Sequence, residues 1–590
     1  MSAWVHPWKL IWFMVLLWGT MGEFWFPACF LTVRCAQAAE TGQVLITRQD
    51  IADLKANRLA DVLNTVPGVS AASSSVSIHG SYKVRVFLDG SLLNDPTSSH
   101  GGIDFDRVSL SQVEKIEILT DAGSLSYGQD ASGGVILITS REIDQTSGFI
   151  RFYGGSQGHF FSEFDASLSQ GPWGLGLRGG WERSDGFKVN NDREKHRVGL
   201  SVSRRSAQAG LAVAIDHQTE DQGFSGLPNF PTPYSRQKSR NFNLAVNGDY
   251  QNFELAAAYF DGRSENRDPS RSLYQTLRVI RAGGDLRYSA SLGSEDAVLG
   301  RVGLNLGTGL EETRAISSDF GSRSENVIHF YGALAWPIPK LPLELSAGMR
   351  ANFNSGFEDS FNPELTVTYR AQLFQLSYRY SRAANTPTFQ QRFGRSSSTE
   401  PNPGLGIETA NNHAVSLILN PHPAFGFHLT GYRNALKGRI TYVRAASSPV
   451  GRYQNVGRAT FTGLDLGFDW TAASYLAFKG SFSMLRAEDC DLGKLLPAQP
   501  KTRARLEMTV RPLEGLTLVG SLDYSGYNFT DRLNTVRLGG RVLTGLRAEY
   551  AIGRYSLFFE AENLFDRDYY YVDGLLAPPL VWFVGLGVTF

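Results

Sequence analysis

The sequence predicts an all-β transmembrane barrel of 22 antiparallel strands, with a small N-terminal α+β plug domain inside its lumen. Three observations predict this fold class: apolar and polar residues alternate over many short segments, the segments are even in number, and short connections alternate with long ones. Successive residues of a strand point to opposite faces, so each segment has one apolar and one polar face. The last segment has Trp582, Val584, Leu586, Val588 and Phe590 on one face and Phe583, Gly585, Gly587 and Thr589 on the other.

A two-sheet sandwich would also give alternation, but it rarely strings together about twenty such segments. A barrel with lipid outside and water inside fits better, and an even number of strands returns both ends of the barrel to the same side. We expect strands at 148–156, 158–169, 173–184, 195–206, 209–221, 237–250, 253–265, 275–292, 300–314, 326–337, 342–354, 361–371, 374–383, 410–420, 425–436, 452–471, 475–488, 501–511, 516–528, 537–551, 555–566 and 581–590.

The connections alternate in length along the predicted barrel. Residues 171–172 and 553–554 are short turns, whereas 384–409 and 437–451 are long polar stretches. Short periplasmic turns opposite longer outer loops are typical of outer-membrane barrels. A barrel of this size has a lumen too wide for its own side chains to fill, so the lumen is either open or plugged.

Residues 43–142 have a different pattern, which supplies the plug. We expect a strand at 43–47, helical turns that begin near Asp50 and end before Pro67-Gly68, and short strands at 75–79, 84–88, 113–119 and 135–138. The chain is therefore predicted to divide into a signal peptide at 1–39, a plug domain at 40–142 and a transmembrane barrel at 143–590.

The first 39 residues have the order of a secretory signal, with Lys9, the apolar run Leu10–Trp18 and an A-x-A-like site at Ala36–Ala39. A start at Met14 or Met21 and a retained anchor helix are the alternatives. After cleavage only Cys490 remains, so we expect neither an intrachain disulfide nor a cysteine metal site. Export without disulfides fits a Gram-negative outer membrane.

The composition supports the same class. The chain has 61 glycines, 37 phenylalanines and 23 tyrosines, which suit crowded barrel walls and aromatic girdles. Beyond the N-terminus there is no run of about 20 apolar residues, as a helical membrane protein would need. A formal net charge of zero gives no electrostatic case for a nucleic-acid partner.

Short motifs recur along the chain in a fixed order. They are Ile46–Ile51, Leu59–Val69, Val86–Gly90, Val113–Leu119 and Tyr127–Ile138 in the plug, and Asn402–Thr409, Tyr453–Gly457, Gly463–Leu466 and Glu562–Asp566 in the barrel. In this order and spacing the chain resembles the TonB-dependent outer-membrane receptors over nearly its whole mature length, the cobalamin type first and the siderophore type second.

The resemblance implies a monomeric receptor that imports a scarce metal chelate or vitamin, of the cobalamin or ferric-siderophore class, without a cofactor. The TonB–ExbB–ExbD complex of the inner membrane would drive the import, and outer-membrane lipid and lipopolysaccharide would surround the barrel. The sequence has no G-x-x-x-x-G-K-[ST] nucleotide-binding loop of its own, so the work would come from outside.

The chain departs from the family in the short box that pairs with an edge strand of TonB. Cleavage near Ala39 leaves only Glu40–Gln43 before the first plug strand, so either Val44, Leu45, Ile46 and Thr47 make the TonB contact or the box is missing. If it is missing, the alternative function is a non-energised plugged barrel that acts as a scaffold or pore.

Two further departures concern cations that dock the plug in the family. The family's "IRG" reads Ile78-His79-Gly80, and its "RGP" reads Thr120-Asp121-Ala122. A histidine holds a positive charge only near or below pH ~6.5. We therefore expect Arg85 or Arg107 to hold the plug through glutamates of the lumen.

In the family the apical loops of the plug face outward, and here they correspond to 71–76 and 91–102. The candidate ligand-binding residues of the second loop are Ser91, Asn94, Asp95, Ser98, Ser99 and His100, with a solvated loop as the alternative. The outer stretch 224–234 adds Phe224, Phe230 and Tyr234, which either cap a ligand or stabilise the loop itself.

Weaker candidates are ionic. Asp185 and Asp192 lie in an oxygen-rich loop that would suit calcium. Five arginines of two neighbouring loops would attract an anionic chelate or lipopolysaccharide phosphates: Arg392, Arg395, Arg439, Arg444 and Arg452. We identify no catalytic constellation, and Glu220 and Asp221 are interpreted as a water-facing surface, so the chain is not expected to be an enzyme.

Overall fold

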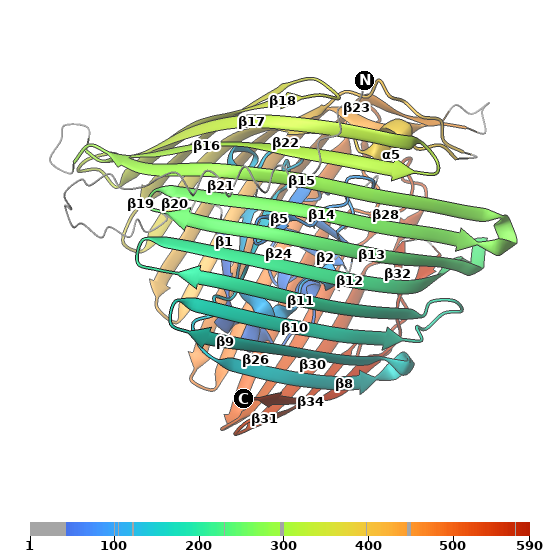
Figure 1. The fold of residues 1–590 in the computed structure, drawn as a ribbon, viewed down its shortest axis with the longest axis horizontal. Helices are drawn as coiled ribbons and strands as arrows, with labels where there is room; N and C mark the ends of the chain where they lie inside the picture. The colour runs from blue at the N-terminus through green and yellow to red at the C-terminus, as the bar shows by residue number, and fades with distance from the viewer. Residues whose placement is uncertain are drawn as a thin grey trace. The chain divides into compact units, whose positions relative to one another are not determined.

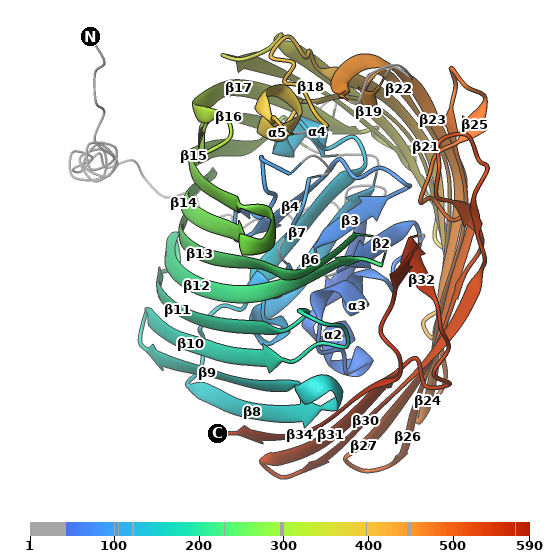
Figure 2. The same cartoon turned by 90° about the vertical axis from the view of Figure 1, so that its right-hand side faces the viewer.

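The computed structural model describes residues 43–590, apart from 73, 99–100, 104, 121–122, 229, 295–299, 397, 445–449 and 573. These residues form a plug with its own sheet and a closed antiparallel barrel (Figures 1 and 2). The predicted signal peptide lies outside the described residues and stays a prediction. No helix among the described residues is long and apolar enough to cross a bilayer.

The plug contains short helices and strands that were largely predicted. Its elements are β1 (Gln43–Thr47), α2 (Arg48–Leu54), α3 (Leu59–Leu63), β2 (Val69–Ala72), β3 (Ser75–Ile78), β4 (Val84–Leu88), β5 (Ser91–Leu92), η1 (Phe105–Arg107), η2 (Leu110–Gln112), β6 (Val113–Thr120), α4 (Ser124–Tyr127) and β7 (Gly134–Ser140). A capping box starts α2: the Thr47 hydroxyl accepts from the Asp50 amide, and the Asp50 carboxylate accepts from the Thr47 amide at 2.8 Å.

The plug sheet has the strand order β1-β6-β7-β4-β5, with β4 and β7 parallel and its other neighbours antiparallel. Val62 and Leu63 of α3 are fully buried together with Ile116, Ile118 and Ile136 of the sheet. Because this core comes from the plug alone, the plug is a folded body rather than a loose strap.

The barrel has the 22 strands that the alternation predicts. They are β8 (Ser147–Gly155), β9 (Phe160–Gln170), β10 (Trp173–Ser184), β11 (Arg193–Arg205), β12 (Ala209–Leu227), β13 (Phe230–Tyr250), β14 (Phe253–Asp268), β15 (Leu273–Leu292), β16 (Val302–Ser317), β17 (Gly321–Pro337), β18 (Leu343–Asn354), β19 (Ser360–Arg370), β20 (Phe374–Asn385), β21 (Glu408–His422), β22 (Phe425–Val443), β23 (Arg452–Ala473), β24 (Leu476–Asp489), β26 (Thr502–Leu513), β27 (Leu516–Ser525), β30 (Arg541–Ile552), β31 (Tyr555–Glu562) and β34 (Val581–Thr589). The last strand pairs with the first, and Gly148 and Phe590 exchange two backbone hydrogen bonds of 2.8 Å, which closes the cylinder.

The connections contain secondary structure that the sequence did not predict. They hold the short strands β25 (Lys494–Leu495), β28 (Asn528–Phe529), β29 (Arg537–Leu538), β32 (Tyr570–Val572) and β33 (Leu575–Leu576), and the helices α5 (Phe389–Phe393), η3 (Ser156–Gly158) and η4 (Pro269–Arg271). The expected loop 222–236 is instead the end of β12 and the start of β13, which pair as far as Leu227 and Phe230.

The two faces of the wall differ as the alternation requires. On β10 and β11 the outward residues Leu175, Leu177, Val198 and Leu200 are each 41–50% exposed. Large apolar side chains are exposed in this way around the barrel, far more than a soluble monomer leaves in contact with water. The outer face therefore fits lipid, and the inner face packs against the plug.

The two ends of the barrel also differ. One end carries tight turns such as 171–172, 251–252 and 553–554, and the other carries the long connections 386–407 and 526–540. By the usual asymmetry, the end with the tight turns is periplasmic and the other is the outer end. Figure 2 shows the plug elements α2, α3, β4, β6 and β7 surrounded by the ring of barrel strands.

Candidate functional site

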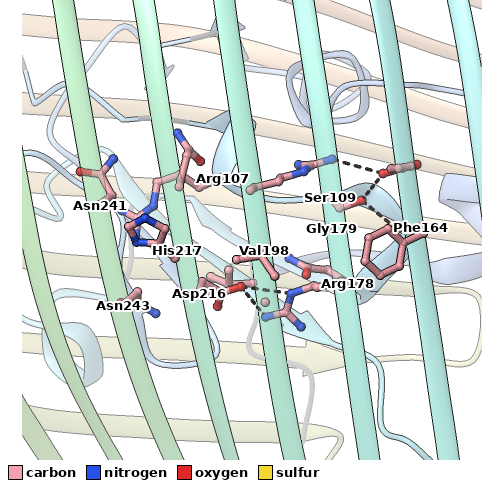
Figure 3. A pocket seen from close by; sticks show the side chains of 17 residues that line it. Arg107, Ser109, Phe164, Arg178, Gly179, Val198, Asp216, His217, Asn241 and Asn243 are labelled. Carbon is pink, nitrogen blue, oxygen red and sulfur yellow. Dashed lines mark hydrogen bonds and ion pairs between the residues drawn. The ribbon is translucent and has the colours of Figure 1, made fainter.

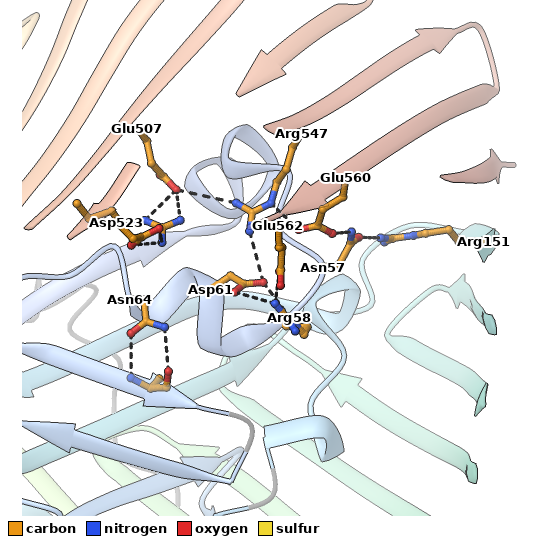
Figure 4. A network of polar contacts seen from close by, with 12 residues as sticks. Asn57, Arg58, Asp61, Asn64, Arg151, Glu507, Asp523, Arg547, Glu560 and Glu562 are labelled. Carbon is orange, nitrogen blue, oxygen red and sulfur yellow. Dashed lines mark hydrogen bonds and ion pairs between the residues drawn. The ribbon is translucent and has the colours of Figure 1, made fainter. Parts of the chain in front are cut away.

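An ionic network joins helix α3 of the plug to β26, β30 and β31 (Figure 4). The Arg58 guanidinium binds Asp61 at 3.3 Å and also contacts Glu562 of β31. Arg547 of β30 lies 3.4 Å from Asp61 and 2.8 Å from Glu560. The plug helix is thus held by a cation of its own and a cation of the wall.

Asp61 is the shared acid of this network. Burial alone would raise the pKa of Asp61, but Arg58 and Arg547 outweigh burial and hold it below its ordinary value. Asp61, Glu560 and Glu562 have ligand oxygens within 4.8 Å of one another, and no other group of three or more possible metal ligands occurs among the described residues. Each acid already has an arginine partner, so the cluster is a docking network rather than a metal site.

A second contact joins His79 of the plug to Asp465 of β23. The two side chains are almost fully buried, with 2.7 Å between His79 Nε2 and Asp465 Oδ2. The His79 ring stacks on Tyr432 of β22, with ring centroids 3.6 Å apart. At the family's arginine position, therefore, a histidine reaches a carboxylate of the wall. At the other departure from the family, Thr120-Asp121-Ala122, both Asp121 and Ala122 lie outside the described residues.

Gly68 makes the His79 contact possible. It has φ +76°, and a Cβ added there would lie 2.7 Å from His79 Cδ2 and closer still to Asp465 Oδ2. We expect Gly68→Ala to weaken plug docking by about 2 kcal/mol or more, since a left-handed alanine costs about 1–2 kcal/mol and the added Cβ would also displace the buried His79–Asp465 contact. The loss can be measured from the rate at which trypsin cleaves the plug and from thermal unfolding.

The control for this variant is Gly321→Ala. Gly321 has φ +70° and open space where its Cβ would go, so it carries only the backbone cost. Equal losses of thermal stability in the two variants, with trypsin release of the plug unchanged in both, would show that the His79–Asp465 contact adds nothing to docking.

The remaining docking contacts lie on other parts of the wall. Arg85 of the plug binds Glu311 of β16 at 3.0 Å, which is the kind of contact the sequence predicted. Arg107 lies over the Phe260 ring at 4.8 Å. Here the wall supplies the cation: Arg281 of β15 donates to the plug carbonyls of Leu92 and Asn94 at 3.1 and 2.8 Å. The plug is therefore tied to the wall on several sides.

A small cavity remains between the plug and strands β9–β13 (Figure 3). It has a volume of about 40 Å³, and Arg178 and Asp216 form an ion pair of 2.7 Å at its edge. This space suits a water molecule or so, whereas pockets for small-molecule ligands are about 300–1,000 Å³. A vitamin or metal chelate cannot pass here unless the plug moves.

The predicted ligand residues of the plug have different environments. Ser91 is buried and donates to Asn243 of β13 at 2.7 Å, while the Asn94 amide bonds Val86 N and Val84 O at 2.9 and 2.8 Å. Both side chains therefore have structural partners.

Of the other candidates in this loop, Asp95 is exposed and accepts from Thr97, and Ser98 is half-buried. Ser99 and His100 lie outside the described residues. Ligand binding by this loop stays a prediction.

The three aromatic candidates lie on the extended β12–β13 hairpin rather than in a loop. Phe224, Phe230 and Tyr234 are 42%, 62% and 64% exposed, so they do not form the packed loop core that was the alternative interpretation. Arg271 lies 4.0 Å over the Phe230 ring. The exposure leaves these rings available at the outer end, and their contact with a ligand stays a prediction.

The structure does not gather the calcium candidates into a cluster of acids. Arg236 binds Asp192 through two contacts of 3.0 and 2.8 Å, and these hydrogen bonds hold the pKa of Asp192 below its ordinary value. Asp185 is exposed beside Arg183 at 3.4 Å. Asp192 is therefore already neutralised by an arginine, which disfavours a calcium ion there.

One of the five loop arginines does not lie on the surface. Arg392 is buried in α5, where it contacts Glu325 and donates to the Gly356 carbonyl at 2.9 Å. It holds the loop together, so an anion-attracting role for this residue is not supported.

The residues predicted to contact TonB, Val44–Thr47, form most of β1 at the edge of the plug sheet, where they pair with β6.

The docking network around Asp61, Glu560 and Arg547 was missed by sequence reasoning. Glu562 belongs to the Glu562–Asp566 motif, but nothing in the motif indicates its partner Arg58, which lies 504 residues away. The wall residues are single charges within alternating strands and have no local signature.

Comparison with known proteins identifies the family. The chain matches the TonB-dependent receptor-like β-barrel model over residues 130–564 and the TonB-dependent receptor plug domain over residues 36–135. It belongs to the TonB-dependent receptor family, and it is accordingly a β-barrel protein of the outer membrane.

Its curated relatives include the vitamin B12 transporter BtuB of Photobacterium profundum, which is 25% identical over 561 residues, or 89% of this chain and 88% of that protein. BtuB of Vibrio vulnificus is 31% identical over 158 residues, or 25% of this chain and 26% of that protein.

Solved structures share the fold. The ferric enterobactin receptor PfeA of Pseudomonas aeruginosa has a TM-score of 0.79 at 16% identity, covering 93% of this chain and 99% of that one. The siderophore receptor PirA of Acinetobacter baumannii has a TM-score of 0.79 at 15% identity, covering 93% and 98%.

Proposed function

We propose that this receptor imports a scarce ligand of the cobalamin or ferric-siderophore class, with cobalamin as the first candidate, and that TonB–ExbB–ExbD drives the import. The observation that carries the proposal is the plug within the barrel, which is tied to several strands and leaves a cavity of about 40 Å³ beside β9–β13. The full-length relative named as a vitamin B12 transporter supports cobalamin, and the siderophore receptors of the same fold support the second class.

This geometry implies that import needs energy from outside the receptor. The contacts that hold the plug must be broken before a ligand can pass, and the sequence has no P-loop motif that would let the chain draw this work from a nucleotide. The β1 strand is at the edge of the plug sheet, and Leu45 within it is 53% exposed. We propose that TonB pairs with this strand or with the segment before it, as an added strand on an exposed sheet edge.

The test is uptake of labelled cobalamin and of a labelled ferric siderophore in cells that express the receptor, with and without TonB. We expect the Kd for the outer ligand to be unchanged and uptake to fall to the background of receptor-free cells when TonB is absent. Binding to the purified protein, followed by metal analysis, separates the two ligand classes.

The other outcomes point to the alternative. Uptake that persists without TonB would indicate a non-energised pore, and surface binding of partners without uptake in either strain would indicate a scaffold. Either result would contradict the proposed function.

A further inference from the structure

Six basic residues lie together on three adjacent strands near the outer end of the barrel. Arg240 of β13, Arg263 of β14 and Arg278 of β15 are direct cross-strand partners, and one step further out Arg236 is the direct partner of Arg267. With Lys238, which lies between Arg236 and Arg240, we call these residues the basic patch. Figure 1 shows β13, β14 and β15 side by side in the wall.

The basic patch faces away from the plug. On β13 the odd-numbered Asn243 and Asn247 bond Ser91 and the Asp89 carbonyl of the plug, so the even-numbered residues point outward. On β15 the odd-numbered Arg281 bonds the plug, so Arg278 points outward too.

On β14 the even-numbered Phe260 lies against the plug residue Arg107, so Arg263 and Arg267 point outward. The register of β13–β14 and β14–β15 is continuous through this region, and the alternation therefore holds for the whole patch.

The patch lies directly above the apolar belt. Toward the periplasmic end of β13, the outward residues after Arg240 are Phe242, Leu244 and Val246, and Tyr250 ends the strand. From Arg240 to Tyr250 the strand is about 34 Å long at about 3.4 Å per residue, and at a tilt of about 40° it spans about 26 Å along the membrane normal, close to the apolar band of about 25 Å in outer-membrane barrels. The basic patch is therefore at the level of the outer-leaflet headgroups.

The acids nearby balance only part of the charge. Asp192 and Asp221 each bind Arg236 at 2.8 Å, Asp221 also lies 3.3 Å from Lys238, and Asp261 binds Arg278 at 2.6 Å.

Asp261 also lies 3.5 Å from Arg263, and Glu265 is the cross-strand partner of Lys238. Arg240 and Arg267 are exposed and have no ion pair among the described residues. Like charges directly opposite each other destabilise a sheet, so these rows need an anion from outside the chain.

We propose that the basic patch binds the phosphate groups of the phosphorylated glycolipid of the outer leaflet. Guanidinium groups bind phosphate through paired, charge-assisted hydrogen bonds. Because the next outward residue toward the membrane is apolar on β13 (Phe242) and on β15 (Ile280), one lipid molecule can place its phosphates on the arginines and its acyl chains on the belt. This site is on the lipid-facing wall, so it is independent of the ligand that the receptor imports.

The test uses the full mature protein in detergent and bisphosphorylated lipid A as the probe. The variant Arg240→Gln/Arg267→Gln removes the two arginines without an acid partner, and we expect roughly 10- to 30-fold weaker binding at low salt, since each basic residue near an anionic lipid surface contributes about a factor of five. Lipid A from which both phosphates have been removed should lose the dependence on these arginines.

The control variant Arg204→Gln/Arg433→Gln removes two outward arginines from β11 and β22, and it should bind lipid A within about twofold of the original protein. The heat-modifiable migration of each variant reports whether the barrel is folded.

Three results would overturn the proposal. They are unchanged lipid A affinity in the Arg240→Gln/Arg267→Gln variant, an equal loss in the control, and binding of phosphatidylglycerol as tight as binding of lipid A. The second would mean that overall charge rather than the patch attracts lipid, and the third would mean a general anionic surface rather than a glycolipid site.

Discussion

Replacing Arg547 by glutamine is expected to loosen the plug by about 3 kcal/mol, because removal of one partner from a buried ion pair leaves a buried charge uncompensated. The Arg547 guanidinium is only 10% exposed and lies 2.8 Å from Glu560, 3.4 Å from Asp61 and 3.9 Å from Glu507. Glutamine keeps part of the volume and loses the charge that three carboxylates share.

The expected result has two readouts. Urea should release the plug of Arg547→Gln at a lower concentration than it releases the original plug, as followed by protease accessibility. In planar bilayers the variant should show more frequent opening to small ions. Arg433→Gln, which removes an arginine from the outward face of β22, should change neither readout.

A double variant identifies the cause. Arg547→Gln/Glu560→Gln removes one of the stranded acids as well, so it should recover part of the lost docking free energy. If Arg547→Gln alone leaves plug release and conductance unchanged, the network around Asp61 does not hold the plug.

The strands of the barrel were predictable because each carries its own signal. A strand between lipid and a wet lumen must alternate, and that requirement is local to about ten residues. The predicted segments 173–184 and 253–265 correspond to β10 and β14 closely. The prediction was wrong where polar composition was interpreted as a loop, since β12 and β13 continue beyond the membrane as a hairpin of polar and aromatic residues.

The plug contacts were less predictable because they join residues that are far apart in the chain. The sequence indicated that His79 stands at a docking position and that Arg85 would pair with an acid, but it did not indicate Asp465 or Glu311. Such partners depend on the register of the whole barrel around the plug. A shift of two residues in one strand would give different pairs with the same alternation.

The candidate ligand residues show the same limit. Ser91 and Asn94 have the chemistry of a ligand-binding loop, yet the structure uses both in hydrogen bonds that shape the plug and dock it. Polar residues in a turn serve either purpose, and only their neighbours in space distinguish the two.

Locking the plug to the wall has the largest expected effect on transport. In a Cys490→Ser background, the pairs Ser91→Cys/Asn243→Cys and Ser132→Cys/Asn385→Cys would tie the plug to β13 and β20. The native side chains in these pairs touch at 2.7 Å and 3.0 Å, so each pair brings plug and wall within side-chain reach. Titration of free thiols after oxidation shows whether both disulfides have formed. We expect the oxidised four-cysteine variant to bind its ligand but to import it at less than about one-tenth of the original rate.

The most direct measurement is therefore ligand uptake by this variant before and after reduction in the same cells, with the single-cysteine variants as controls. The account predicts that oxidation stops import without loss of surface binding and that a reductant restores it. Import at the full rate with both disulfides formed would contradict the central claim that the plug seals the lumen and must move for the ligand to pass.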